Sequence, residues 1–545
     1  MSNSQSNVWF LVSKYSYQIL LVLFVLWMCI GIFPLQCYET DGQEIILGCD
    51  VMYRDGWTLP PVYSYEYRMQ PLIMIVVTCL KYLMPFFTCE QIYCVLTAIA
   101  GLAFLMGSLL FARHITDAGK TITLIAAILL PEMYAILMYA NTAIFAAACF
   151  IWALMLIIKG KWWQAVLLLC IGAWFRVDIV SVYPVVLPLL YFEGKTVWQS
   201  FWKAAACGLS VAVISFLGYW LMKADALGTY GNYERWNDIV TPALRFYAIF
   251  GFYSLAYFIM LPLVLCVILG QKHWKELFVV LLPILLLHGV MSSFGNASKH
   301  FLYIAPFVII AGIRALQWMC DVCCKRPILK WAGLVVAVLF MTVSVRQKRL
   351  ELAWLQKNPL NNVGVVAPVA DFHVAGKDIA VAIGAGPQVI TRDEYMLATG
   401  HLFYSWYIHS IKTVLQEWRK QQKAVIDKAS SSNILTYEWG ASAPISYEYV
   451  TEGYHYCQKE NMPDKYAFTI KNDKRELNFW RVLWTEEEHD VPSVVARMDS
   501  LSSSFLPGDR YIIAAPAHFG SFQFLDELSE TGKLKKQAER IYQIK

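Results

Sequence analysis

Residues 141–192 read NTAIFAAACFIWALMLIIKGKWWQAVLLLCIGAWFRVDIVSVYPVVLPLLYF, and this stretch indicates the fold class. Its charged residues are Lys159, Lys161, Arg176 and Asp178, and most residues between them are apolar. Long apolar runs separated by short basic turns are typical of helices that cross a membrane. The whole 545-residue chain has a similar composition, with 58% hydrophobic and 16% charged residues. The sequence therefore predicts a polytopic α-helical membrane protein and excludes soluble, fibrous and disordered classes.

The apolar runs predict about 11–13 membrane spans, each needing roughly 20 residues. The first run extends to about Pro34 without a cleavage site, so we expect a retained span. Further runs begin near Pro71, Ile92, Thr121, Asn141, Trp163, Val177, Phe201, Ala243, Phe278, Phe301 and Trp331. The runs at Trp163 and Val177 are short and separated by charges, so they are either two half-spans or a broken helix.

Basic residues in alternate short loops predict the orientation. Those on one side are Lys159, Lys161, Lys195, Lys203, Lys272, Lys275, Lys325, Arg326 and Lys330. By the positive-inside rule this side is cytoplasmic, and loops 223–244 and 292–300 face out with everything after the last run. The first loop, residues 35–70, has six acidic and two basic residues and should also face out. Eleven predicted spans follow it, but an even number is needed, so one boundary between Pro71 and Phe192 is misplaced.

Two parts of the chain differ in composition. Residues 1–345 form the predicted transmembrane part, whereas residues 346–545 mix charged and apolar segments. In the second part DIAVAIGAG, SNILTYEWG and DRYIIAAPA are typical of strands separated by helical stretches, so we expect an extracytoplasmic α/β domain. The net charge of +5 is not concentrated in a basic block, so nucleic-acid binding is not expected.

The first outer loop contains candidate catalytic acids. Asp41 is either an ordinary N-cap of a surface helix or a general base for a membrane-bound substrate, with Glu39 as its companion. Arg54 and Asp55 are further candidates in the same loop. Cys37 and Cys49 also lie there and would be able to form a disulfide in an oxidising compartment, which spacing alone does not decide.

Two later pairs of charges lie in apolar surroundings. Arg176 and Asp178 are either a structural ion pair or a phosphate-binding site, because a guanidinium binds phosphate oxygens in a planar fork. Lys299 and His300 enter a later span from an outward loop. They are either interface anchors or cations that neutralise a phosphate leaving group, and both interpretations stay open.

These motifs resemble those of the GT-C superfamily of polytopic glycosyltransferases. The superfamily includes protein and dolichyl-phosphate mannosyltransferases, aminoarabinose transferases and RgtA/B/C/D-like enzymes. The segments that carry the resemblance are ETDG at 39–42, YRDGW at 53–57, RMQPL at 68–72, FRVD at 175–178 and SKHFLYIAPF at 298–307. Asp41 matches the first-loop catalytic acid of the family, but Gly42 and Gln43 replace the acidic and aromatic residues common there.

The resemblance implies transfer of a sugar from a polyprenyl-phosphate donor to a glycan, lipid or protein acceptor, with inversion. Asp41 would accept the acceptor proton, while Arg176, Lys299 and His300 would stabilise the departing phosphate. A divalent cation, Mg²⁺ or Mn²⁺, on Glu39 and Asp41 stays undecided. We expect the protein in a bacterial inner membrane, with membrane lipids as neighbours and the active site on the extracytoplasmic face.

Two other functions are considered. A transporter or flippase of lipid-linked sugars would also be polytopic, but it predicts internal repeats, which the sequence lacks. A lipid-to-glycan ligase or polymerase would place its key residues in a large late outer loop, and such loops are short here. Exposed aromatic side chains of the C-terminal domain, such as Tyr437, Trp439 and Tyr454, are predicted to read the acceptor.

Overall fold

The computed structural model describes most of the chain. The longer described segments are residues 3–38, 40–57, 71–138, 141–222, 274–291, 302–325, 401–429, 433–436, 439–457 and 468–481. The shorter ones are residues 365–367, 371–374, 377–380, 388–390, 397, 496, 499–500, 510–513, 529–532, 534–538 and 541–544. The predicted spans that begin near Ala243 and Trp331 lie outside the described residues.

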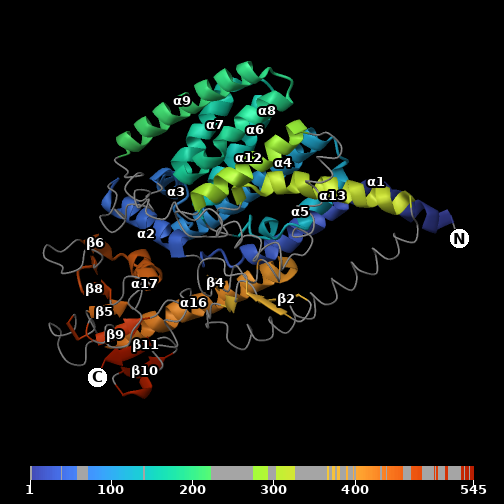
Figure 1. Cartoon of the computed structure of the whole chain (residues 1–545). Helices are drawn as coiled ribbons and strands as arrows, with labels where there is room; N and C mark the ends of the chain where they lie inside the picture. Colours follow the sequence, from blue (N-terminus) through green and yellow to red (C-terminus); the bar gives the residue numbers. More distant parts are fainter. Residues whose placement is uncertain are drawn as a thin grey trace.

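The first part of the described chain is a bundle of helices (Figure 1). Its helices are α1 (Asn3–Cys29), η1 (Ile30–Ile32), α2 (Thr40–Asp55), α3 (Pro71–Leu83), α4 (Cys89–Thr116), α5 (Lys120–Ile128), η3 (Pro131–Tyr134), α6 (Thr142–Ile158), α7 (Trp162–Phe175), η4 (Val177–Val185), α8 (Val186–Phe192), α9 (Val197–Leu221), α12 (Trp274–Met291) and α13 (Ala305–Lys325). Three described helical stretches are long and apolar enough to cross a membrane, namely Tyr15–Ile32, Cys89–Thr116 and Val197–Leu221.

Polar side chains fix where several of these helices begin. Thr88 and Gln91 form a capping box at the start of α4, and Thr196 and Gln199 form one at the start of α9. At the start of α6, the Asn141 side chain accepts a hydrogen bond from a backbone N–H of the first turn. Such caps satisfy N–H groups that have no partner inside the helix. The polar residue before each apolar run therefore sets the boundary of the helix.

The apolar run at Pro71 forms α3, which packs beside α2 instead of crossing the bundle. The Thr78 hydroxyl donates to the carbonyl of Cys49 at 3.4 Å, and the Tyr82 hydroxyl donates to that of Tyr53 at 3.0 Å. With 13 residues, α3 is about 20 Å long, too short for a hydrocarbon core of about 30 Å. The run predicted near Thr121 forms α5, which is shorter still at nine residues. Both runs lie in the part of the chain where one predicted boundary is misplaced, and both spans stay predictions.

The short runs at Trp163 and Val177 are two antiparallel segments that meet at Arg176. α7 ends there, and η4 and α8 return beside it, with the Tyr183 hydroxyl donating to the carbonyl of Leu169 at 2.7 Å. A Cβ on Gly172 would lie only 3.0 Å from that hydroxyl, so glycine allows the close approach. The chain thus places a charged residue at a turn between two apolar segments.

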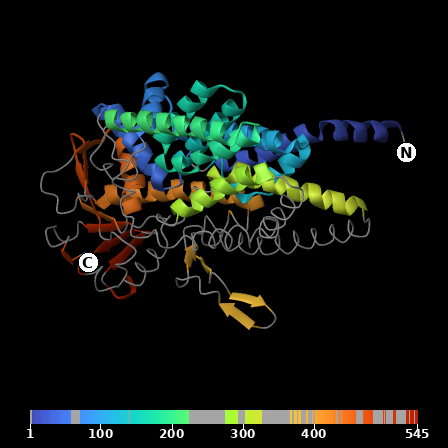
Figure 2. The same cartoon turned by 45° about the horizontal axis from the view of Figure 1, so that its top comes forward.

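The described residues of the C-terminal part form two α-helices and a mixed sheet (Figures 1 and 2). The helices are α16 (Tyr404–Ala429), preceded by η9 (His401–Phe403), and α17 (Trp439–Thr451). The seven-stranded sheet has the order β10-β11-β9-β5-β8-β7-β6, and β5 runs parallel to β8 and β9. Its strands are β5 (Asn433–Thr436), β6 (His455–Cys457), β7 (Phe468–Lys471), β8 (Glu476–Arg481), β9 (Arg510–Ile513), β10 (Leu534–Ala538) and β11 (Ile541–Ile544).

Two small antiparallel pairs complete the described strands. β1 (Val365–Ala367) pairs with β4 (Gln388–Ile390), and β2 (Asp371–Val374) pairs with β3 (Lys377–Ala380). In Figure 2 the chain termini lie at opposite ends of the molecule, with the seven-stranded sheet at the C-terminal end. The long helix α16 runs from the sheet to the end of α1, where it contacts η1.

The close packing of α4 predicts a sensitive glycine. A Cβ on Gly101 would collide with the carbonyl oxygen of Ile136, a backbone atom that has little freedom to move. We expect Gly101→Ala to lower the free energy of unfolding by about 1–3 kcal/mol, as overpacking does. Gly208→Ala in α9 is the matched control, because a Cβ there meets nothing within 4 Å. Thermal unfolding in detergent measures both; equal unfolding temperatures would contradict the packing described here.

Candidate functional site

A polar cluster surrounds Arg176 at the turn between α7 and η4. Arg176 has an extended backbone (φ −162°, ψ 119°) and ends α7. Its Nε donates to Oδ2 of Asp178 at 2.9 Å, and its Nη1 lies 3.3 Å from both Oδ1 of Asn141 and Oγ1 of Thr142. The guanidinium therefore connects the turn to the start of α6.

The carboxylate of Asp178 is buried and held from two sides. Its Oδ1 accepts a hydrogen bond of 2.7 Å from the hydroxyl of Tyr303, which precedes α13. The side chain of Asp178 is 1% exposed and that of Arg176 is 13% exposed. A buried charge is tolerated only when it is paired and hydrogen-bonded. The ion pair that the sequence allowed is thus present, and it joins α6, α7, η4 and the residues before α13.

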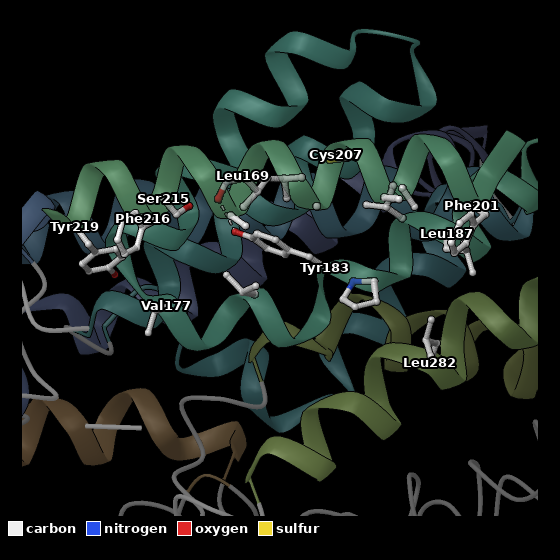
Figure 3. A pocket seen from close by; sticks show the side chains of 18 of the residues that line it. Leu169, Val177, Tyr183, Leu187, Phe201, Cys207, Ser215, Phe216, Tyr219 and Leu282 are labelled. Carbon is white, nitrogen blue, oxygen red and sulfur yellow. Dashed lines mark hydrogen bonds between the residues drawn. The ribbon is translucent and has the colours of Figure 1, made fainter. Parts of the chain in front are cut away.

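An apolar pocket of about 740 Å³ adjoins this cluster (Figure 3). It lies between α9 on one side and η4 and α8 on the other, with Leu282 of α12 also lining it. Val177, which separates Arg176 from Asp178, lines the pocket, and Figure 3 shows it on the same side as Tyr219 and far from Phe201. Phe201 and Tyr219 are 18 residues apart on α9, or about 27 Å at 1.5 Å per residue.

The opposite face of α9 is exposed and apolar. Leu209 is 68% exposed, and Val213 and Leu217 are also exposed. A helix with such a face is stable only against lipid or another apolar surface. Because α9 is long and apolar enough to cross a membrane, the pocket lies along a candidate span, with the polar cluster at one of its ends.

A stack of three aromatic rings connects the polar cluster to the start of α4. The ring centroids of Tyr93 and Phe145 are 6.1 Å apart, and those of Phe145 and Phe175 are 5.3 Å apart. Phe175 directly precedes Arg176, while Tyr93 is in the first turns of α4 close to Glu90. Glu90 in turn accepts a hydrogen bond from the N–H of Cys37 in the first loop. The Arg176 cluster and the first loop are thus at the same end of the bundle.

The candidate acid Asp41 lies in the first turn of α2, since this helix begins at Thr40. A carboxylate in a first turn is favoured by the helix dipole. The side chains of Asp41 and Asp55, together with Glu39, Lys299 and His300, lie outside the described residues. The backbone of Asp41 is nevertheless placed by α2, which packs against α3, α4 and α17.

The structure shows the surroundings of Arg54 and of the two first-loop cysteines. Arg54 donates from Nη2 to the carbonyl of Thr451 at 3.0 Å, so it connects α2 to α17. Cys37 and Cys49 are both fully buried, and no disulfide joins them in the structure. Each thiol takes the place of a small apolar side chain in the packed loop.

The structure also bears on the aromatic side chains of the C-terminal part that were predicted to contact the acceptor. Tyr454 is buried, and its ring packs edge-on against Tyr449 with centroids 5.2 Å apart. The prediction that it is exposed is wrong, because an alternating polar and aromatic segment does not tell which ring faces the interior. Tyr437 and the side chain of Trp439 lie outside the described residues.

Two buried carboxyl groups were not found from the sequence. Burial raises the pKa of Asp50 in α2 to about 6, and Glu132 in η3 is 2% exposed. Because the folded-state pKa of Asp50 lies above its unfolded-state value, the stability that its protonated form contributes is lost as the pH rises through about 6. The apolar residues next to these carboxyl groups in the sequence do not show that other helices cover them. The buried carboxyl groups are therefore identified only from the packing. Among the described residues there is no group of three or more His, Cys, Asp or Glu side chains arranged to hold a metal.

Comparisons with known proteins support the fold. No protein-family model and no curated protein matches the chain. Among solved structures, the crystal structure of ArnT from Cupriavidus metallidurans bound to undecaprenyl phosphate is similar, with a TM-score of 0.52 and 13% identity. The match covers 96% of this chain and 97% of that chain. This protein therefore shares the overall fold of that structure, and its long apolar helices indicate a polytopic membrane protein.

The buried hydrogen bond of Tyr303 generates a stability prediction. Tyr303→Phe removes the hydroxyl that donates to Asp178, leaving a buried carboxylate oxygen short of a donor, so we expect a loss of about 1–3 kcal/mol. Tyr82→Phe is the matched control, since it also removes one hydroxyl hydrogen bond but at a half-exposed position where water replaces it. Denaturant unfolding in detergent measures both variants; an equal loss would mean that Asp178 does not depend on Tyr303.

Proposed function

We propose that this protein is a membrane glycosyltransferase that moves a sugar from a polyprenyl-phosphate donor to an acceptor hydroxyl, with inversion at the anomeric carbon. The observation that carries the proposal is the position of Arg176. It is at one end of the apolar pocket, and the ring stack from Phe175 to Tyr93 brings it to the end of the bundle where the first loop begins. A phosphate site and a base on one side of the membrane are what such a transfer requires.

The donor would bind by two different physical forces. The apolar pocket provides room for an isoprenoid tail at membrane depth, and burial of apolar surface there would supply most of the affinity. The guanidinium of Arg176 would bind the phosphate, because its five N–H donors allow a carboxylate and a phosphate to be contacted together. The fold likeness to ArnT, solved with undecaprenyl phosphate bound, supports this class of ligand.

The chemical step would then use the first loop. Asp41 accepts the proton of the acceptor hydroxyl, and the acceptor oxygen forms a bond to the anomeric carbon. The bond between that carbon and the phosphate oxygen breaks on the opposite face, and the phosphate leaves with the electron pair. Arg176, with Lys299 and His300, stabilises the negative charge that develops there. Glu39 assists Asp41, and the two carboxylates are the residues that would hold a Mg²⁺ or Mn²⁺ ion.

The distribution of lysines supports the orientation of the proposal. Lys203 lies 5.6 Å from the ring centre of Trp162, and Lys275 lies 4.5 Å from that of Tyr191. These contacts bring the starts of α7, α9 and α12 together at the end of the bundle opposite Arg176. By the positive-inside rule that end is cytoplasmic, so the reaction takes place on the extracytoplasmic face, in a bacterial inner membrane.

The first test is a mass profile of lipid-linked and surface glycans from cells that express wild type or Asp41→Asn at equal membrane levels. We expect the variant to lose one sugar from a glycan, with the unmodified acceptor accumulating, because Asn cannot accept the proton. Asp117→Asn is the control: Asp117 ends α4 in a left-handed conformation that Asn also adopts, far along this helix from the first loop.

Other outcomes of the same profile would overturn parts of the proposal. A complete lipid-linked glycan that accumulates on the cytoplasmic side in the variant would favour a flippase. If the Asp41→Asn and wild-type profiles are identical, Asp41 is not the base and the first loop is not the catalytic loop.

A further inference from the structure

The segment that leads from α1 to the first-loop acids is held by side chains instead of by its own secondary structure. The N–H of Cys37 donates to Oε1 of Glu90 at 2.9 Å. The carbonyl of Cys37 accepts from Nη2 of Arg419 at 3.3 Å and from Nε2 of Gln43 at 3.0 Å. The backbone N–H and carbonyl of Cys37, two residues before Glu39 and four before Asp41, are therefore held by three side chains.

The same segment is held again closer to α1, by the same helix. Lys412 donates from Nζ to the carbonyls of Gly31 and Ile32, at 2.9 and 3.0 Å. Nδ1 of His409 lies 2.8 Å from the carbonyl of Phe33. His409, Lys412 and Arg419 lie within about 80° of one another around α16, at 100° per residue. One face of α16 thus contacts the chain from Gly31 to Cys37.

The two basic side chains that make most of these contacts are almost completely buried. Lys412 is 1% exposed and Arg419 is 2% exposed. Burial lowers the pKa of Lys412, which shows the cost of placing an ammonium there. Buried charges of this kind often add little net stability, because desolvation offsets the attraction between the groups. What they supply is a defined geometry.

Arg419 is the centre of this arrangement. It lies 3.2 Å from Glu90 of α4 and 3.6 Å from Glu448 of α17, and its guanidinium is 6.0 Å from the ring centre of Tyr447. One guanidinium therefore contacts α4, α17 and the Cys37 peptide while belonging to α16. A planar fork with five donors suits such a junction, and a lysine does not reproduce it.

We propose that Arg419 is a positioning residue, through which the C-terminal part of the chain sets the place of the catalytic first loop. The inference rests on the proposed transferase function. Arg419 does not touch the reacting groups in this account. It holds Glu90 and the backbone of Cys37, which precedes α2 and its residue Asp41.

Sugar transfer by the purified full-length protein in lipid vesicles tests this role, with kcat and the KM of the donor measured separately. We expect Arg419→Met to lower kcat by about a hundredfold, as an error of about 1 Å in a reacting group does. The KM of the donor should stay within about threefold, since the pocket and Arg176 are unchanged. Arg419→Lys should recover only part of kcat. Lys423→Met is the control, because Lys423 is also on α16 but pairs with Asp427 and Glu452.

Labelling of single thiols distinguishes local movement from unfolding. In Arg419→Met, Cys37 should react with a maleimide faster than in wild type, while Cys170, also fully buried, should not. If Cys170 reacts too, the variant is unfolded, and Glu90→Gln takes its place in the kinetic comparison. That variant keeps the oxygen that accepts the Cys37 N–H but loses the charge that faces Arg419.

The outcomes separate the inference from the proposed function. If wild type transfers sugar and Arg419→Met, or Glu90→Gln in its place, has the kcat of Lys423→Met, the positioning role is wrong and the transferase proposal stands. A variant that raises the KM of the donor without lowering kcat also contradicts the role. If wild type transfers no sugar from any polyprenyl-phosphate donor, the proposed function itself fails.

Discussion

The ion pair between Arg176 and Asp178 is the constraint on which the arrangement of the bundle depends. Both groups lie between apolar segments, where an unpaired charge would cost several kcal/mol. The pair is satisfied only if the start of α6, the turn after α7 and Tyr303 before α13 come together. Once they do, η4 and α8 return beside α7, and the space between them and α9 forms the apolar pocket. The same packing of η4 and α8 beside α7 therefore satisfies the ion pair and forms one wall of the pocket.

A second polar junction determines how the C-terminal part meets the bundle. Arg419, Lys412 and Glu90 are buried where α16 crosses the ends of α1 and α4. The chain from Gly31 to Cys37 lies at this second junction, and the rings of Tyr93, Phe145 and Phe175 lead from it toward Arg176. In the proposed reaction, one junction would bind the phosphate and the other would position the base. The fold would thus hold both the phosphate-binding residue and the segment that carries the base in defined positions.

The sequence predicted those features that depend on local composition. The polytopic fold followed from the apolar runs, and Arg176 and Asp178 were identified because charges inside such runs need partners. The number of spans did not follow in the same way. The runs at Pro71 and Thr121 form helices of only 13 and nine residues, and apolar residues have the same composition whether they face lipid or cover another helix.

Long-range partners could not be predicted. Tyr303 lies 125 residues from Asp178, and Arg419 lies 329 residues from Glu90. In the sequence, Lys412 and Arg419 belong to the charged stretch WYIHSIKTVLQEWRKQQKAVIDKA, which is typical of a solvated helix face. Their burial follows from the docking of α16 on η1, which depends on carbonyl groups that every sequence has. The pairing of Cys37 and Cys49 was ambiguous for the same reason, because spacing along the loop does not give distance in space.

In the proposed reaction, the pocket beside Arg176 holds a polyprenyl phosphate. Photocrosslinking locates this ligand, using two polyprenyl phosphates that carry a photoreactive group either next to the phosphate or at the far end of the tail. Mass spectrometry of the labelled peptides then locates each group. We expect the first probe to label residues around Val177 and Tyr219 and the second to label residues around Leu187 and Phe201, the opposite end of the pocket. Labelling confined to other helices, or the same peptides with both probes, would contradict it.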